Sequence, residues 1–318
     1  MFSLLLSHYV IVCAAIIVPT FAVAFGQGAI CRLALSVLDQ QPESRGPLNR
    51  LVVIALAISE TSAILSLLIS VFLLWGNTPP NLATLLGELG IIGALGIPAA
   101  VIGFAASLPI RAALDALQRQ PLNAPNISNL LLLAVSIGQT PVIFGFFLAW
   151  IILGRVPTVD CMTTGIQLLS CGIAFGLGTI GPSIGIALFG KQACTSIGQN
   201  REAYASIFSF TVISQALIET PILFSFVVAL LILLRPLPTT HALSAVIYLA
   251  TAFSVSIPTF GAGISSGRIA RTACREIAQN PPIYQMLSRL SIFGQTLTDT
   301  NAIYGLIVAL LMFYGTLP

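Results

Sequence analysis

The sequence carries little charge. Asp, Glu, Lys and Arg together account for 7% of the 318 residues, whereas 57% of the residues are hydrophobic and the mean hydropathy is +1.00. Soluble domains carry about 25% charged residues, so this composition excludes a soluble globular protein and indicates a membrane protein. The formal net charge of +3 gives no indication of a nucleic-acid partner, and none is expected.

Metal-binding and redox residues are also scarce. The six cysteines show no pairing pattern, and Cys194 and Cys274, which share a register, are expected to be small packing residues in helices. His8 and His241 fall near outer helix ends at different registers, so they do not predict a metal site. We expect neither a bound metal nor a cofactor.

Two glycine-rich stretches match nucleotide-binding motifs only in part. Gly176, Gly178 and Gly181 have the spacing of a dinucleotide fingerprint, and residues 185–191 match most of a phosphate-binding loop. No strand is predicted before either stretch, and Gln192 stands where the loop needs Ser or Thr. Nucleotide binding by this chain is therefore not expected.

Long apolar runs dominate the rest of the sequence. Each can form a helix that crosses a hydrocarbon core of about 30 Å, which takes about 20 residues. A helix satisfies its own backbone hydrogen bonds, as lipid requires, so we predict an all-α membrane protein with eight transmembrane helices. The first run lacks the basic flank of a signal peptide, so we interpret it as mature structure. The predicted spans are residues 8–36, 51–75, 84–114, 128–153, 162–190, 207–234, 242–267 and 286–314.

Positive charges are distributed unevenly between these spans. Of the 13 Lys and Arg residues, 11 lie in or beside alternate turns, and only Arg155 and Arg235 lie in the other connections. The positive-inside rule therefore predicts four basic turns on the cytoplasmic side and both termini outside. The 11 residues are Arg32, Arg45, Arg50, Arg111, Arg119, Lys191, Arg201, Arg268, Arg271, Arg275 and Arg289.

Four polar positions repeat with a period of about 80 residues. Glu60, Gln139, Glu219 and Asp299 are 79, 80 and 80 residues apart, and each is followed by Thr. Self-similarity at a fixed period indicates tandem copies of one structural unit. We therefore predict four tandem helical hairpins. Their predicted boundaries are 1–79, 80–158, 159–238 and 239–318.

The two helices of each hairpin differ in composition. The first helices are rich in small residues such as Gly178 and Gly263, which let membrane helices approach closely, whereas the second helices carry bulky Leu, Ile, Val and Phe. We therefore predict concentric rings, with the first helices inside and the second helices outside, facing lipid or a partner.

The repeated carboxyl groups lie deep in the predicted membrane. Each follows about ten residues of predicted helix from the turn, which at 1.5 Å per residue is about 15 Å, half of the hydrocarbon thickness. A charge at that depth costs about 2.5–3.5 kcal/mol, so we expect each acid to be neutral, through a proton or an ion, while it faces lipid. Three acids at one depth argue against a purely structural role.

Several motifs resemble those of the c subunit, the proteolipid of the rotor ring of rotary ATP synthases. They are Gly294-Gln-Thr-Leu-Thr-Asp299, Ser214-Gln-Ala-Leu-Ile-Glu219-Thr-Pro and the turn Arg119-Gln120-Pro121. The similarity covers the chain four times over, and the turn is more like the F-type than the vacuolar type. The resemblance implies a non-catalytic, multi-pass rotor protein that forms a ring with copies of itself, in lipid, in a bacterial cytoplasmic membrane.

The resemblance also implies roles for individual residues. Glu60, Glu219 and Asp299 would carry ions past an arginine of the stator (its a subunit), whereas Gln139 cannot titrate, so four hairpins would carry three sites. The hairpin turns would contact the central stalk of the soluble ATPase head. The turn residues assigned to this contact are Gln41, Pro42, Arg119, Gln120, Pro121, Gln199, Arg201, Gln279 and Pro281.

The residues near the acids favour protons over sodium ions. Sodium-binding members of the family use a first-helix Gln, a carbonyl two residues before the acid and a hydroxyl after it. Only Gln27 occupies the Gln register, with Ser266 in the fourth copy, and Pro221 frees the Leu217 carbonyl or simply kinks its helix. Sodium transport and a vacuolar-type proteolipid are the alternatives. The supporting residues predicted for the ion sites are Gln27, Thr61, Thr220, Thr300, Leu217 and Ser266.

Two other protein classes fit the sequence less well. A stand-alone channel or secondary transporter is usually built from inverted or broken-helix repeats around one site, whereas these repeats are parallel and carry three acids. A scaffolding membrane protein leaves the spaced acids unexplained.

Overall fold

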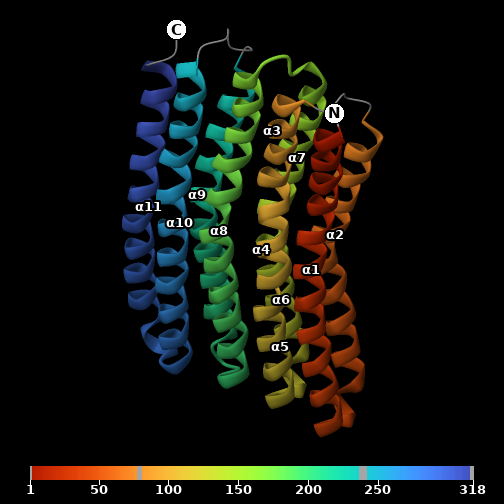
Figure 1. The fold of residues 1–318 in the computed structure, drawn as a ribbon. Helices are drawn as coiled ribbons and strands as arrows, with labels where there is room; N and C mark the ends of the chain where they lie inside the picture. The colour runs from red at the N-terminus through yellow and green to blue at the C-terminus, as the bar shows by residue number, and fades with distance from the viewer. Residues whose placement is uncertain (1, 77–80, 236–241, 316–318) are drawn as a thin grey trace.

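The computed structural model describes residues 2–76, 81–235 and 242–315. These residues form helices and turns and contain no strand. Four helical hairpins stand side by side in chain order, from red at the N-terminus to blue, with all four turns at one end (Figure 1). In the described ranges, eight helical rods are long and apolar enough to cross a membrane. The prediction of an all-α membrane protein made of four hairpins is confirmed.

Each hairpin consists of a first and a second helical rod. The first rods are α1 (Phe2–Gln40); α3 (Leu82–Ile91) with η2 (Ile92–Gly96), α4 (Ile97–Ala105) and α5 (Ser107–Arg119); α8 (Met162–Gln199); and α10 (Ala242–Gln279). The second rods are α2 (Arg45–Trp75); α6 (Ala124–Gly138) with α7 (Thr140–Arg155) and η4 (Val156–Thr158); α9 (Tyr204–Leu234); and α11 (Tyr284–Gly315).

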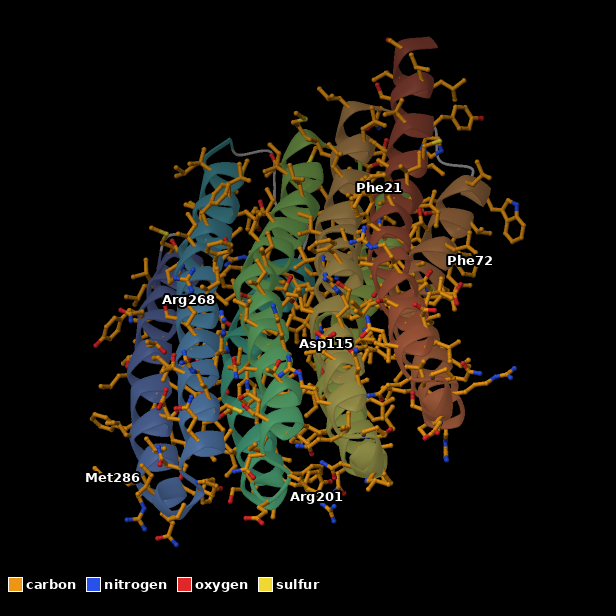
Figure 2. The ribbon with its side chains drawn as sticks, turned by 90° about the horizontal axis from the view of Figure 1, so that it is seen from below. Phe21, Phe72, Asp115, Arg201, Arg268 and Met286 are labelled. Carbon is orange, nitrogen blue, oxygen red and sulfur yellow. The ribbon has the colours of Figure 1, made fainter. Side chains whose placement is uncertain are left out.

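A proline opens the second rod in three hairpins. The short 3-10 helices η1 (Pro42–Ser44), η3 (Pro121–Asn123) and η5 (Pro281–Ile283) begin with Pro, whose fixed φ suits the first helical position. In hairpin 3 Arg201 occupies this position, and α9 begins at Tyr204 without a 3-10 turn. Figure 2 shows Arg201 at the turn end of the bundle and Phe72 near the opposite end.

The first rods approach one another through glycine. A Cβ on Gly93 would lie 2.8 Å from the backbone carbon of Gly172 on α8, and a Cβ on Gly263 would overlap the backbone of Pro182. Backbones this close leave no room for a larger residue. Large apolar side chains are exposed on both kinds of rod, such as Phe21 on α1 and Leu311 on α11. The close packing of the first helices agrees with their small residues, whereas the predicted concentric rings stay a prediction.

Prolines interrupt both rods of hairpin 2. Pro98 has no N–H, and the helix before it widens into the π turn η2, where the Ile97 N–H donates to the Ile92 carbonyl. Pro141 follows the break between α6 and α7 at Gln139. Elsewhere, prolines lie inside continuous helices, at Pro19, Pro182, Pro221 and Pro258.

The helices are longer than the apolar runs predicted. The second helix of hairpin 1, for example, was predicted at 51–75 and begins at Arg45, because polar residues near the membrane surface continue the helix. The predicted boundary at 158/159 falls at the end of η4. The boundaries at 79/80 and 238/239, and His241, lie outside the described residues.

Candidate ion-carrying site

The three acids stand at the midpoints of their rods. Glu60 is central in the 31-residue α2, Glu219 in the 31-residue α9, and Asp299 in the 32-residue α11. Gln139 has the same place between α6 and α7. Because the rods begin earlier than predicted, each acid lies about 22 Å from the start of its helix rather than about 15 Å. Rods centred on a bilayer hold these residues at its midplane.

Exposure of these four side chains changes along the row of hairpins. Asp299 is 6% exposed and Gln139 is 5% exposed. Glu219 is half-buried, and Glu60 is exposed. Among the described residues, hairpin 1 stands at the end of the row, with no hairpin before it (Figure 1).

The midpoint positions of hairpins 2 and 3 contact the second rod of the preceding hairpin. The Glu219 carboxyl lies within hydrogen-bonding reach of the Thr140 hydroxyl. The Ser62 hydroxyl donates to Gln139 Oε1 at 3.3 Å. The surroundings of one acid are therefore built from two neighbouring hairpins. Sequence reasoning did not predict Ser62 or a role for Thr140 at Glu219.

Two glutamines, each four residues before an acid, add a second layer of contacts. Gln215 Nε2 donates to the Ala134 carbonyl of hairpin 2 at 3.1 Å. Gln295 Nε2 donates to Ser214 Oγ of hairpin 3 at 3.3 Å. Both glutamines are fully buried. They lie inside the motifs that precede Glu219 and Asp299, and their shared register in hairpins 3 and 4 was a weak signal for them.

The threonines that follow the midpoint positions bond within their own helices. In three hairpins the hydroxyl donates to the carbonyl two residues before the midpoint, so this carbonyl already has a partner. The pairs are Thr61 with Ile58, Thr140 with Ile137, and Thr300 with Leu297.

Hairpin 3 departs from this arrangement. The Thr220 hydroxyl donates to the Ala216 carbonyl at 3.1 Å. Pro221 has no N–H to offer the Leu217 carbonyl, four residues earlier. The Leu217 oxygen therefore has fewer competing donors than its equivalents.

The structure separates two predicted supporting residues from the acids. The Ser266 hydroxyl donates to Gln295 Oε1 at 3.4 Å, which places Ser266 one helical turn from Asp299. Gln27 is half-buried on α1, and among the described residues it has no hydrogen bond to Glu60.

Turn amides link successive hairpins. Gln41 Nε2 donates to the Gln118 carbonyl at 2.7 Å, Gln120 Nε2 to the Gly198 carbonyl at 3.2 Å, and Asn200 Nδ2 to the Ala278 carbonyl at 2.9 Å. Two glutamines assigned to stalk contact are thus engaged within the chain. Other assigned turn residues are exposed and free to meet a partner, namely Pro42, Arg119, Pro121, Gln199, Arg201 and Gln279; Pro281 is half-buried.

Two further predictions concern cysteine and metal. Cys194 and Cys274 are buried free thiols, in agreement with the predicted packing role. Across the described ranges, no three His, Cys, Asp or Glu side chains come together as metal ligands would.

Comparison with known proteins identifies the family of the chain. A family model for the C subunit of ATP synthase matches residues 169–232 and 249–312, in hairpins 3 and 4. The ATP synthase c subunit of Dehalococcoides mccartyi is 40% identical over 68 residues, which cover 21% of this chain and 90% of that protein. The ATP synthase c subunit of Chloroflexus aurantiacus is 35% identical over 68 residues, with the same two shares of 21% and 90%.

A third relative extends this similarity. The ATP synthase c subunit of Mycoplasma capricolum subsp. capricolum is 30% identical over 78 residues, which cover 24% of this chain and 76% of that protein. Four hairpins of one design, with a polar residue at the middle of each second rod, agree with these matches. The chain is a member of the family of ATP synthase c subunits, in the form of a tandem fusion.

Proposed function

We propose that this chain is a rotor-ring subunit of an ion-translocating ATP synthase, and that Glu60, Glu219 and Asp299 carry protons through the membrane. The observation that carries the proposal is the position of these acids, each at the midpoint of a membrane-length rod. In this role the chain catalyses no covalent step. ATP is made or hydrolysed on the soluble head of the same machine.

The free-energy cost of a charged carboxyl in hydrocarbon supports a rotary mechanism. A charged carboxyl at the bilayer centre costs about 2.5–3.5 kcal/mol. Each acid is therefore protonated during the part of a rotation in which it faces lipid. Release requires water and a countercharge, which the stator would supply from its a subunit. Each proton that crosses delivers about 2.3 kcal/mol per 100 mV of membrane potential, and this energy turns the ring.

The turn amides favour a ring made from copies of this chain. Asn280 holds the position of Gln41, Gln120 and Asn200, but the described part of the chain places no further hairpin beside it. The equivalent acceptor in hairpin 1 is the Asp39 carbonyl, and among the described residues no turn amide of another hairpin bonds to it. A second copy would supply both missing partners.

Closure of the ring would also complete the surroundings of Glu60. The Thr140 hydroxyl of hairpin 2 lies beside Glu219 of hairpin 3. By the same repeat, Thr300 of one copy would face Glu60 of the next. Glu60 is exposed in the single chain, as expected of a side chain whose neighbour is missing.

The basic turn end would face the cytoplasm and the central stalk. The side chains of Arg119 and Arg201 are exposed there. The positive-inside rule supports this orientation in a bacterial cytoplasmic membrane. Lipid and the stator would contact the apolar second rods.

The contacts near the acids favour protons over sodium ions. A hard cation such as sodium takes several oxygen ligands, whereas a proton needs only the carboxyl and one hydrogen-bond partner. In three of the four hairpins the carbonyl two residues before the midpoint, one of the oxygens that a sodium site would use, already accepts a hydrogen bond from the threonine hydroxyl. The amide side chain of Gln27 makes no hydrogen bond to a described acid.

The proposal is tested with the three amide variants Glu60→Gln, Glu219→Gln and Asp299→Asn in one chain. We expect ATP-driven proton uptake by vesicles to be lost, because no carboxyl remains to exchange a proton. Uptake at the rate of the unchanged chain would disprove the proposal.

Carbodiimide labelling of the same three carboxyls identifies the ion. Labelling that slows as the pH rises, with or without sodium, is expected of proton sites. Protection by sodium at alkaline pH would assign sodium instead.

A further inference from the structure

A buried acid and a buried histidine meet far from the membrane midplane. Nδ1 of His8 on α1 and Oε1 of Glu88 on α3 are 2.7 Å apart, within the range of a charge-assisted hydrogen bond. Glu88 is 2% exposed and His8 is 8% exposed. The proposed rotary mechanism uses neither residue.

The pair lies at the end of the bundle opposite the turns. Each residue stands about six positions, or about 9 Å, from the start of its helix. The contact therefore joins the first rods of hairpins 1 and 2 near the membrane surface on the side opposite the basic turns. It is too far from Glu60 and Gln139, at the rod midpoints, to belong to the ion-carrying sites.

Hairpin 3 is held at the same level by groups that do not exchange protons near neutral pH. Within the hairpin, Gln167 Nε2 donates to the Ile232 carbonyl at 2.7 Å, and Arg235 donates to the Phe313 carbonyl of hairpin 4 at 2.9 Å. Among the described residues, only the joint between hairpins 1 and 2 relies on a histidine and a carboxylate. Its strength therefore depends on how many protons it holds.

The charge balance of the pair is favourable with one proton. With one proton between Nδ1 and Oε1, the pair is a neutral unit or an ion pair of zero net charge. Loss of that proton leaves a lone carboxylate, and gain of a second leaves a lone imidazolium. Either lone charge is buried, and a buried charge without a partner is strongly destabilising. Oε2 of Glu88 has no other partner among the described residues to offset it.

We propose that His8 and Glu88 form a proton-binding site, separate from the mid-membrane acids, that holds α1 against α3 while it contains one proton. The ligand is a proton exchanged with the outer aqueous phase. The site makes the joint between hairpins 1 and 2 sensitive to pH on that side of the membrane. It goes beyond the proposed rotor function and does not depend on it.

Other titratable groups near this end do not substitute for either partner. On the elements packed against α1 and α3, they are Tyr9 and Cys13 on α1, Arg155 on α7, Asp160 and Cys161 in the following connection, and Cys171 on α8. The ring of Tyr9 lies edge-on to His8 at 5.5 Å. Within the described residues, Glu88 has one ion-pair partner, which is His8.

Hydrogen exchange of the full chain in lipid nanodiscs tests the site. Protection of amides at the outer ends of α1 and α3, corrected for the intrinsic rate, is measured from about pH 4 to about pH 10, a range that spans the ordinary titration of Glu and His. We expect protection to be greatest at intermediate pH and to fall by about tenfold or more towards both extremes. The outer end of α9 is the internal reference and should show no such maximum.

A matched variant distinguishes the effect of proton binding from the effect of the side-chain contact itself. His8→Gln with Glu88→Gln keeps an amide hydrogen bond but cannot titrate, so its protection should not vary with pH. If this variant does not fold, the pH profile of Glu88→Gln alone serves, since it removes the carboxyl and should abolish the alkaline loss. A flat profile in the unchanged chain, or the same maximum in the double variant, would overturn the proposal.

Discussion

At the scale of single residues, Gln139 separates hairpin 2 from the other three hairpins. It occupies the midpoint register, is 5% exposed, and accepts a hydrogen bond from Ser62. A carboxyl oxygen can accept the same bond. Its Nε2 group has no partner among the described residues, so nothing is lost when that group becomes oxygen. The site is therefore built to accept an acid without rearrangement.

We expect Gln139→Glu to create a fourth ion-carrying carboxyl. Carbodiimide labelling should rise from three to four carboxyls per chain, and the number of protons moved per ATP should increase by about one third. Proton counting during ATP hydrolysis in vesicles measures the ratio. Ser136→Glu, at an exposed position on the same helix, is the control and should leave the ratio unchanged. An unaltered ratio in Gln139→Glu would show that the midpoint register does not define the site.

The midpoint acids were predictable because their spacing repeats four times. Gln215 and Gln295 were not, since their register holds Leu56 and Val135 in hairpins 1 and 2. A pattern present in only half the copies is a weak signal. The partners of these glutamines, such as Ser214, follow from helix rotation and not from spacing.

At the scale of the helices, packing between first rods depends on backbone contact. On α10, a Cβ at Gly263 would overlap the Pro182 backbone, whereas a Cβ at Gly261, two residues earlier, would meet nothing within 4 Å. Neither glycine has a positive φ, so the difference is one of space alone.

We predict that Gly263→Ala destabilises the bundle by about 1–3 kcal/mol, because backbone cannot move aside as a side chain can. Gly261→Ala, the matched control, should be neutral or slightly stabilising, since it lowers the entropy of the unfolded chain. Thermal or denaturant titration in detergent measures both. Equal effects of the two substitutions would contradict the close approach of α8 and α10.

Helix interruptions were harder to predict than helices. Pro98 and Pro258 share a register, yet a π turn precedes Pro98 while α10 runs unbroken through Pro258. A missing N–H frees one carbonyl in both cases. Neighbouring helices decide whether the chain bends, widens or continues.

At the scale of the whole molecule, the described row of hairpins has two edges, at hairpins 1 and 4, where the turn-amide bond seen between neighbouring hairpins is missing. Turn amides join hairpin 1 to 2, 2 to 3 and 3 to 4. On the outer edge of hairpin 4, Asn280 is exposed. The same bond would join hairpin 4 to hairpin 1 of another copy, at the Asp39 carbonyl.

We therefore predict that Asn280→Cys combined with Asp39→Cys forms disulfides between chains, in a background where the exposed Cys13 and Cys31 are replaced by Ser. The product should be a ladder of chain multiples on a denaturing gel. Asn200→Cys with Ala278→Cys, which copies the contact inside one chain, is the control and should cross-link without changing the chain count. Cross-linking in the control alone would mean that a different protein occupies the edge of hairpin 4.

The sequence by itself determined the number of hairpins, the shared register of the acids and the absence of one acid from hairpin 2. These follow from hydropathy and from a period of about 80 residues, which are properties of the chain read in one dimension. Only the tertiary structure decided that Thr140 lies beside Glu219, that turn amides bond to the next hairpin, and that His8 meets Glu88. Such contacts depend on how each helix is rotated and shifted against its neighbour, and glycine packing and proline breaks set that rotation.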